Sequence, residues 1–102
     1  MSERRQVRVA PSFFDRLDEL LPEERSSTGL PSIADFLLHE LPPLMDALAD
    51  DYEATTLEVR GLLSVRTLIA AGSLIPRLAL YVTLDADDAV EIIYLQLDDE
   101  AN

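Results

Sequence analysis

The hydrophobic pattern of this chain changes its period once, near residue 55, and this change constrains the fold more than any other feature. Before it, apolar residues recur every three to four positions, as they do along one face of a helix. After it, apolar and polar residues alternate, as they do in a strand with one buried face. The sequence therefore predicts a helical first half followed by a sheet.

The N-terminal part predicts a short strand and a first helix. Residues 6–10 alternate between apolar and polar, and Pro11 ends the alternation. An S-x-x-D pattern, Ser12 with Asp15, is typical of a helix start, and an apolar stripe with helical spacing follows it. Pro22 follows the last apolar residue of the stripe. We therefore expect one helix between two prolines, and a loop over 23–30.

A second helix is expected from Ser32, again with an S-x-x-D pattern formed with Asp35. Its apolar stripe keeps a helical period to residue 52, straight through Pro42 and Pro43. Prolines remove backbone donors and clash with the preceding turn. The unbroken stripe therefore predicts one kinked helix, or two coaxial pieces, on a single core face. The two helices should form a hairpin.

Strand-like alternation runs over 55–60, 62–70, 77–84 and 90–97. The short connections among the final strands predict antiparallel neighbours. The predicted order is β-α-α-β-β-β, an α+β fold with a short N-terminal strand, a helical hairpin and a three-stranded antiparallel meander. A bulge in the turn region around Gly72 would reverse the faces of part of the sheet.

Each helix has a single apolar stripe, so one sheet face should cover the helices and the other should stay open. Alternation predicts that the covered face carries Leu63, Val65 and Ile69, then Leu78, Leu80, Val82 and Leu84, then Ile93, Leu95 and Leu97. Ile92 is expected on the opposite side. The open face is then expected to carry Arg66, Arg77, Tyr81, Thr83, Tyr94 and Gln96.

Four of these residues, Arg66, Arg77, Tyr81 and Tyr94, form the candidate catalytic site. Arginine offers a planar fork suited to phosphate, and tyrosine offers a stacking face or a proton donor. Together they could hold a phosphodiester and stabilise charge on it as it reacts. The alternative is that they make ordinary solvent-exposed pairs, which improve solubility and block pairing at the sheet edge.

The charge of the chain restricts its partners. Its formal net charge is −12, and all eight basic residues are arginine. A broad phosphate-binding surface is not expected, because nucleic-acid affinity grows with the number of phosphates neutralised. Only residues 54–84 carry a positive balance, with three arginines against one glutamate. Any nucleic-acid contact would therefore be local to that segment.

Few residues suit metal or cofactor chemistry, and neither a metal nor a cofactor is expected. The chain has no cysteine, and its one histidine, His39, is expected on an exposed helix face. The acidic clusters 50–51, 87–88 and 98–100 lack calcium-loop spacing and are interpreted as solvated turns and tail.

At 102 residues, 48% of them hydrophobic, the chain is expected to fold as one domain, 1–102. The ordered core should span 6–97, followed by an acidic tail, 98–102. No run approaches the ~20 apolar residues of a membrane span, and the N-terminus lacks an apolar signal core. We therefore expect a cytoplasmic protein with no membrane contact.

The stretches VRVAPSFFDRLDELL and VRGLLSVRTLI, with PRLALYVTLDADDAVEIIYLQL, resemble the RelE/ParE superfamily of type II toxins, nearest to its HigB-like branch. The resemblance covers roughly residues 6–97. It rests on the strand pattern, on an arginine strand at Arg66, and on an Arg-to-Tyr strand from Arg77 to Tyr81. It implies a small α+β toxin that cleaves mRNA at the ribosome or inhibits gyrase, and that a partner antitoxin neutralises.

Three functions follow as expectations. The first is the toxin component of a toxin–antitoxin system, bound by an antitoxin; a catalytic form would be an mRNA endonuclease that contacts ribosome or mRNA through the open face. The second is a non-enzymatic acidic interaction module of the same fold, catalytically degenerate, in which net charge speeds association with a basic partner. The third is an unrelated α+β domain that dimerises through the open sheet.

Overall fold

The computed structural model describes residues 4–21, 31–72, 75 and 77–97. The expected loop over 23–30, part of the turn region around Gly72 and the acidic tail lie outside the described residues. The helices are α1 (Pro11–Leu20), α2 (Ile33–Asp35), a π-helical turn η1 (Phe36–Glu40), α3 (Leu41–Asp50) and α4 (Tyr52–Thr55). The strands are β1 (Val7–Val9), β2 (Leu57–Val59), β3 (Leu62–Ala70), β4 (Leu78–Leu84) and β5 (Val90–Leu97).

The described strands form one sheet in the order β1-β5-β4-β3-β2. β1 runs parallel to β5, and the other neighbours are antiparallel. The α+β class is confirmed. The expected three-stranded meander is not, because four strands follow the helices in the described chain: the alternating stretch 55–60 contributes a strand of its own, β2.

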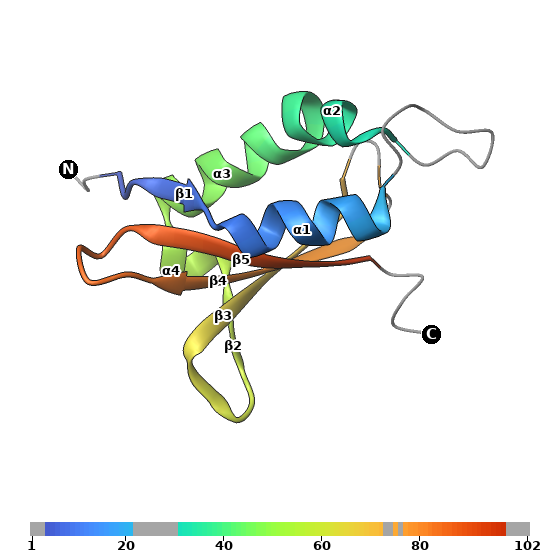
Figure 1. The fold of residues 1–102 in the computed structure, drawn as a ribbon. Helices are drawn as coiled ribbons and strands as arrows, with labels where there is room; N and C mark the ends of the chain where they lie inside the picture. Colours follow the sequence, from blue (N-terminus) through green and yellow to red (C-terminus); the bar gives the residue numbers. More distant parts are fainter. Residues whose placement is uncertain (1–3, 22–30, 73–74, 76, 98–102) are drawn as a thin grey trace.

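The helices lie on one side of the sheet, and the other side is left open (Figure 1). Between helices and sheet lies the core, whose largest fully buried side chains include Phe13, Phe36, Leu48, Leu80 and Ile92. The rings of Phe13 and Phe36 lie 6.1 Å apart between their centroids and join α1 to the η1 turn. The β2–β3 hairpin projects away from the helix layer, beyond the open face (Figure 1).

Only one of the two expected capping patterns forms. Ser32 and Asp35 make a reciprocal capping box, with hydrogen bonds of 3.1 and 3.2 Å. The Ser12 prediction is wrong, because the cap is Ala10, two residues earlier, and α1 begins at Pro11, whose ring fixes a helical φ and whose missing N–H would have no intrahelical partner. Ser12 Oγ donates instead to the carbonyl of Ile93, at 3.0 Å.

The η1 turn explains how the second helix passes Pro42 and Pro43. The Leu41 N–H donates to the Phe36 carbonyl, five residues back, and this wider turn ends where the prolines begin. The prolines occupy the first turn of α3, a position that tolerates a missing N–H. The apolar stripe stays on the core face, since Phe36, Leu41 and Leu48 are all buried.

A bulge in β5 reverses the faces of the part of the strand before Tyr94, whereas Leu95 and Leu97 are buried as predicted. Tyr81 lies opposite Tyr94, whereas the next residue, Val82, lies opposite Ile92, so Ile93 has no partner on β4. Ile92 is fully buried and Ile93 is only half-buried. The prediction that Ile93 packs inward and Ile92 faces outward is therefore wrong.

Candidate functional site

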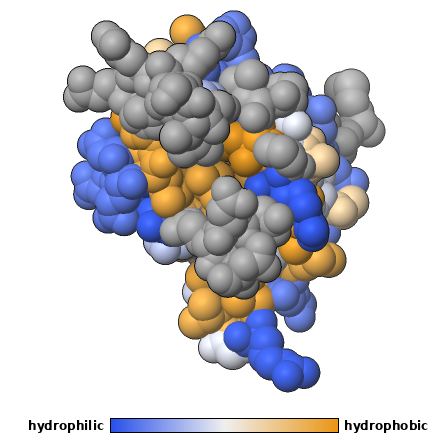
Figure 2. All heavy atoms as spheres, turned by 90° about the vertical axis from the view of Figure 1, so that its right-hand side faces the viewer, coloured by the Kyte–Doolittle hydropathy of each residue, from blue (hydrophilic) through white to orange (hydrophobic). Residues whose placement is uncertain are grey.

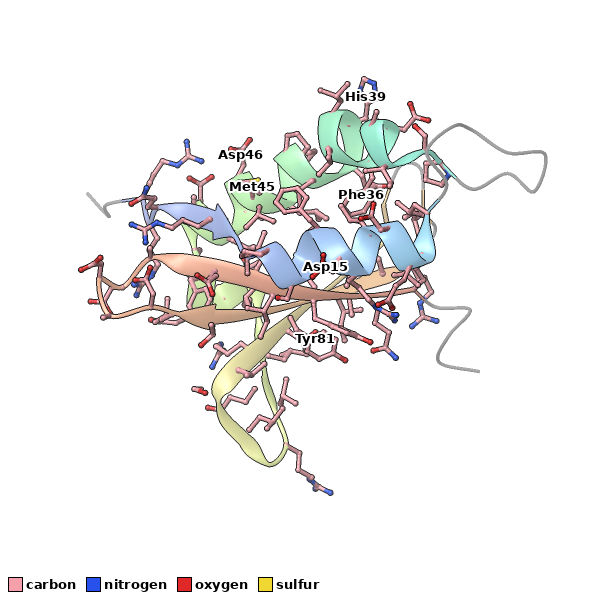
Figure 3. All side chains as sticks on the ribbon, in the orientation of Figure 1. Asp15, Phe36, His39, Met45, Asp46 and Tyr81 are labelled. Atoms are coloured by element: carbon pink, nitrogen blue, oxygen red, sulfur yellow. The ribbon has the colours of Figure 1, made fainter. Side chains whose placement is uncertain are left out.

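The open face of the sheet is organised by one row of cross-strand partners. Leu57 pairs with Thr67, Thr67 with Tyr81, and Tyr81 with Tyr94. Directly paired residues share a side of the sheet. Tyr81 points away from the helices (Figure 3), so the whole row faces away from the core. Tyr81 and Tyr94 are thus brought together as the sequence predicted.

Arg66 is not part of this face, and its prediction as an open-face residue is wrong. Its partner on β4 is Val82, which is fully buried under the helices. The cause is the alternation of β3: Leu68 is buried and pairs with Leu80, so Arg66, two residues before it, faces the helices as well. Val65 and Ile69 therefore face outward.

On the helix side, Arg66 holds the α4–β2 junction. Its Nε donates to Thr56 Oγ1 at 2.6 Å, and its Nη2 donates to the carbonyls of Thr56 and Glu53, at 3.0 and 3.3 Å. The guanidinium carbon lies 5.8 Å from the ring centroid of Tyr52. These contacts assign Arg66 a structural role and separate it from Tyr81 by the thickness of the sheet.

The two open-face tyrosines are fixed by their neighbours. The Tyr81 hydroxyl donates to Gln96 Oε1 at 2.7 Å, and the rings of Tyr81 and Tyr94 meet edge to face, 5.8 Å apart. Arg16 of α1 stacks its guanidinium on Tyr94, 4.5 Å from the ring centroid. This places Arg16, Tyr94, Tyr81 and Gln96 in one connected group.

Arg16 was missed by the sequence analysis. Its Nε donates to the Leu95 carbonyl at 2.9 Å, and Ser12, one helical turn earlier, donates to the Ile93 carbonyl. Both carbonyls lie on β5 beyond the short pairing with β1, where the strand edge lacks a neighbouring strand. The i, i+4 spacing of Ser12 and Arg16 on α1 is the only signal in the sequence, and it does not identify their partner.

Two shallow hollows lie on the open face. The larger, about 490 Å³, is lined by Arg16, Leu62, Val65, Tyr81, Ile93, Tyr94 and Gln96. The smaller, about 190 Å³, includes Thr67, Ile69, Arg77, Tyr81 and Gln96 among its lining residues. Arg77 is exposed and lies on the same face as Tyr81, as predicted.

The surface that carries these hollows is strongly apolar. Leu57, Leu62, Ile69 and Tyr94 are 61, 53, 59 and 43% exposed, and these four belong to the open face. Figure 2 shows hydrophobic residues gathered at the lower end of the molecule, where the β2–β3 hairpin projects. In a chain of charge −12, such a concentration of exposed aliphatic side chains marks a surface suited to binding.

A polar atom at the centre of this face has no partner. Thr67 Oγ1 is buried and makes no hydrogen bond, and it is the single such side-chain atom found in the described part of the chain. It lies between Leu57 and Tyr81 in the cross-strand row. A buried hydroxyl without a partner costs stability, so this position is not optimised for the isolated protein.

Behind the sheet, Tyr52 has a perturbed ionisation. Burial raises the pKa of its hydroxyl above the ordinary value of 10.0, and the nearby charges of Arg66 and Arg5 oppose that shift. The two guanidinium carbons lie 5.8 and 5.6 Å from its ring centroid. Tyr52 is thus a core residue between two cations, remote from the open face.

Metal ligands do not gather among the residues described: no group of three histidine, cysteine, aspartate or glutamate side chains is placed to hold an ion. His39 is exposed on the η1 turn, as expected, and points outward from the helix layer (Figure 3). None of the helices described is long and apolar enough to span a bilayer.

A comparison with protein-family models finds no match for this chain, and comparisons with curated proteins and with solved structures find none either.

Proposed function

We propose that this protein is the toxin component of a RelE/ParE-like toxin–antitoxin system and that it acts by binding a protein target through the open sheet face. The observation that carries the proposal is the exposure of four large apolar side chains, Leu57, Leu62, Ile69 and Tyr94, on that face. Exposed apolar patches of this kind are typical of protein–protein interaction sites.

Two features support the toxin class. The sequence resemblance to the RelE/ParE superfamily covers the strand–helix–strand order, with a final antiparallel run of strands and an Arg-to-Tyr strand from Arg77 to Tyr81. The same strand lies at the centre of the open face, between β3 and β5. A toxin of this class would be neutralised by an antitoxin that covers the same surface.

Binding is favoured over mRNA cleavage by the position of Arg66. The candidate catalytic set needs two arginines beside two tyrosines, and Arg66 faces the helices instead. What remains together is Arg77, Tyr81 and Tyr94, with the hydroxyl of Tyr81 engaged by Gln96. Without Arg66 beside it, the exposed guanidinium of Arg77 next to an aliphatic surface suits protein recognition better than phosphodiester chemistry, which requires several groups aimed at the developing charge.

Induced expression in bacteria tests the proposal. The wild-type chain should arrest growth. Arg77→Glu should relieve the arrest, because it replaces the exposed guanidinium of the contact surface by a negative charge. Tyr81→Phe should leave the arrest intact, since only a hydroxyl is lost and the ring remains.

mRNA integrity, followed by primer extension in the same cells, separates the two mechanisms. Intact transcripts during arrest support protein binding. Cleaved transcripts, with rescue by Tyr81→Phe, would establish the endonuclease instead, and growth unaffected by the wild-type chain would contradict the toxin proposal.

A further inference from the structure

Most arginines of this acidic protein are neutralised by a carboxylate. Among the seven that the structure describes, five form ion pairs: Arg4, Arg5, Arg8, Arg16 and Arg66. Arg60 and Arg77 form none with any described residue, although the chain contains 20 acidic residues. Both of these side chains are exposed. Two exposed cations without an ion pair in the described part of so acidic a chain call for an explanation.

The two arginines lie at opposite ends of β3. The outward-facing residues Leu62, Val65 and Ile69 of this strand form an apolar strip. Arg60 lies in the tight turn of the β2–β3 hairpin, where Gly61 adopts a positive φ of 85°. Arg77 directly precedes β4, whose first residue pairs with Ala70 at the far end of β3. Leu62 lines the hollow at the hairpin end, and Ile69 lines the hollow that holds Arg77.

The span between the two charges sets the size of an occupant. Eight residue steps separate Leu62 from Ala70 along β3, which corresponds to about 26 Å at ~3.3 Å per residue. An α-helix covers that distance with about 17 residues at ~1.5 Å each. Leu62 at the hairpin end and Arg16 of α1 line the larger hollow, so the apolar surface forms a shallow groove between them.

We propose that this groove binds an amphipathic helix of a protein partner, with aliphatic residues along the helix and an acidic residue near each end to pair with Arg60 and Arg77. The inference rests on the proposed function and adds the chemistry of the partner that binds this face. The aliphatic stripe of the helix covers Leu62 and Ile69. Its carboxylates meet the two guanidiniums that form no ion pair with any described residue.

The charges favour this occupant over two others. A second copy of the chain, related by a two-fold axis through the strip, would bring arginine against arginine. A single-stranded RNA would need closely spaced cations along its backbone, whereas here the length of β3, about 26 Å, lies between the two arginines.

Two synthetic 18-residue probes test the inference. Both carry the same leucine stripe on an alanine helix, one with glutamate near each end and the other with lysine, and circular dichroism confirms that their helicity is matched. Fluorescence anisotropy measures their affinity for the full chain. The glutamate probe should bind about fivefold more tightly than the lysine probe, as expected for two exposed ion pairs. The difference should shrink at high salt.

The double variant Arg60→Glu/Arg77→Glu should reverse this preference, and the control His39→Glu, on the far side of the helix layer, should leave it unchanged. Equal affinity for the two probes, or a preference that the double variant does not reverse, would overturn the inference. Displacement of the glutamate probe by poly(U) would also overturn the inference, and so would a concentration-dependent dimer that prevents the glutamate probe from binding. If Arg77→Glu relieves growth arrest while both probes bind equally, the inference fails and the proposed function stands.

Discussion

Replacing Arg66 by alanine should destabilise the fold far more than replacing Arg77, although Arg66 lies in β3 and Arg77 directly precedes the neighbouring strand β4. Arg66 donates three hydrogen bonds, to Thr56 Oγ1, to the Thr56 carbonyl and to the Glu53 carbonyl. Hydrogen bonds to a charged group contribute about 1.5–3 kcal/mol each when shielded, and less with partial exposure. We expect Arg66→Ala to lower the free energy of unfolding by about 2–3 kcal/mol.

The Glu58 ion pair adds little to this figure. Its charged atoms lie 3.8 Å apart, and the Glu58 side chain is 90% exposed. Such pairs contribute between about 0 and 1 kcal/mol. The loss is therefore assigned to the α4–β2 junction. It corresponds to a fall in Tm of roughly 10–20 °C for a domain of this size.

Urea unfolding followed by circular dichroism measures both variants under the same conditions. Arg77→Ala, which removes an exposed side chain, should change the free energy of unfolding by less than about 0.5 kcal/mol. Arg66→Lys should fall between the two, because it keeps the charge and loses the Nε bond to Thr56. Equal stabilities for Arg66→Ala and Arg77→Ala would refute the assignment of Arg66 to the helix side.

Three further predictions concern positions behind or within the sheet. Gly72→Ala should destabilise the protein by about 1–3 kcal/mol in thermal unfolding, because an added Cβ would lie against the buried Glu40 carboxylate. That carboxylate accepts a hydrogen bond from the Ile75 N–H at 2.8 Å. An unchanged Tm would contradict this prediction. Thr67→Val should be neutral or stabilising by up to about 1 kcal/mol in urea unfolding, because it removes a buried hydroxyl without a partner, and a loss of more than that would reveal an unrecognised bond. Stability should fall as pH rises above about 10, since the raised pKa of Tyr52 keeps its folded form protonated while the unfolded form ionises; Tyr52→Phe should remove that part of the pH dependence, and an identical slope in both proteins would contradict it.

The alternation of β4 was predictable because its two faces differ sharply. Leu78, Leu80 and Val82 are all buried, and the residues between them are polar or small. The α+β class followed from an equally clear change of period, whereas the S-x-x-D pattern gave a capping box at Ser32 but not at Ser12. In such segments one physical requirement, burial of a single apolar face, decides the outcome.

The candidate site was harder to predict because β3 is apolar on both faces. Leu68 faces the helices and Ile69 faces outward, so periodicity alone fits either phase. The phase is set by pairing with β4, which the sequence of β3 does not encode. That ambiguity placed Arg66 on the wrong side.

The faces of β5 and the role of Arg16 depend on long-range structure. Ile93 forms a bulge whose position no local residue marks. Arg16 reaches Tyr94 only because α1 lies beside the β5 edge that β1 leaves unpaired. Contacts of this kind join segments almost 80 residues apart and are invisible to a local pattern.

The most direct test of the open face as the functional surface compares the variants Ile69→Asp and Leu38→Asp in the growth-arrest assay. Both residues are large, apolar and exposed, at 59 and 69%, but Ile69 lies on the open face and Leu38 on the η1 turn of the helix layer. With both variants shown to be folded by circular dichroism, Ile69→Asp should abolish the arrest and Leu38→Asp should retain it. Arrest that survives Ile69→Asp, or that Leu38→Asp alone relieves, would contradict the account.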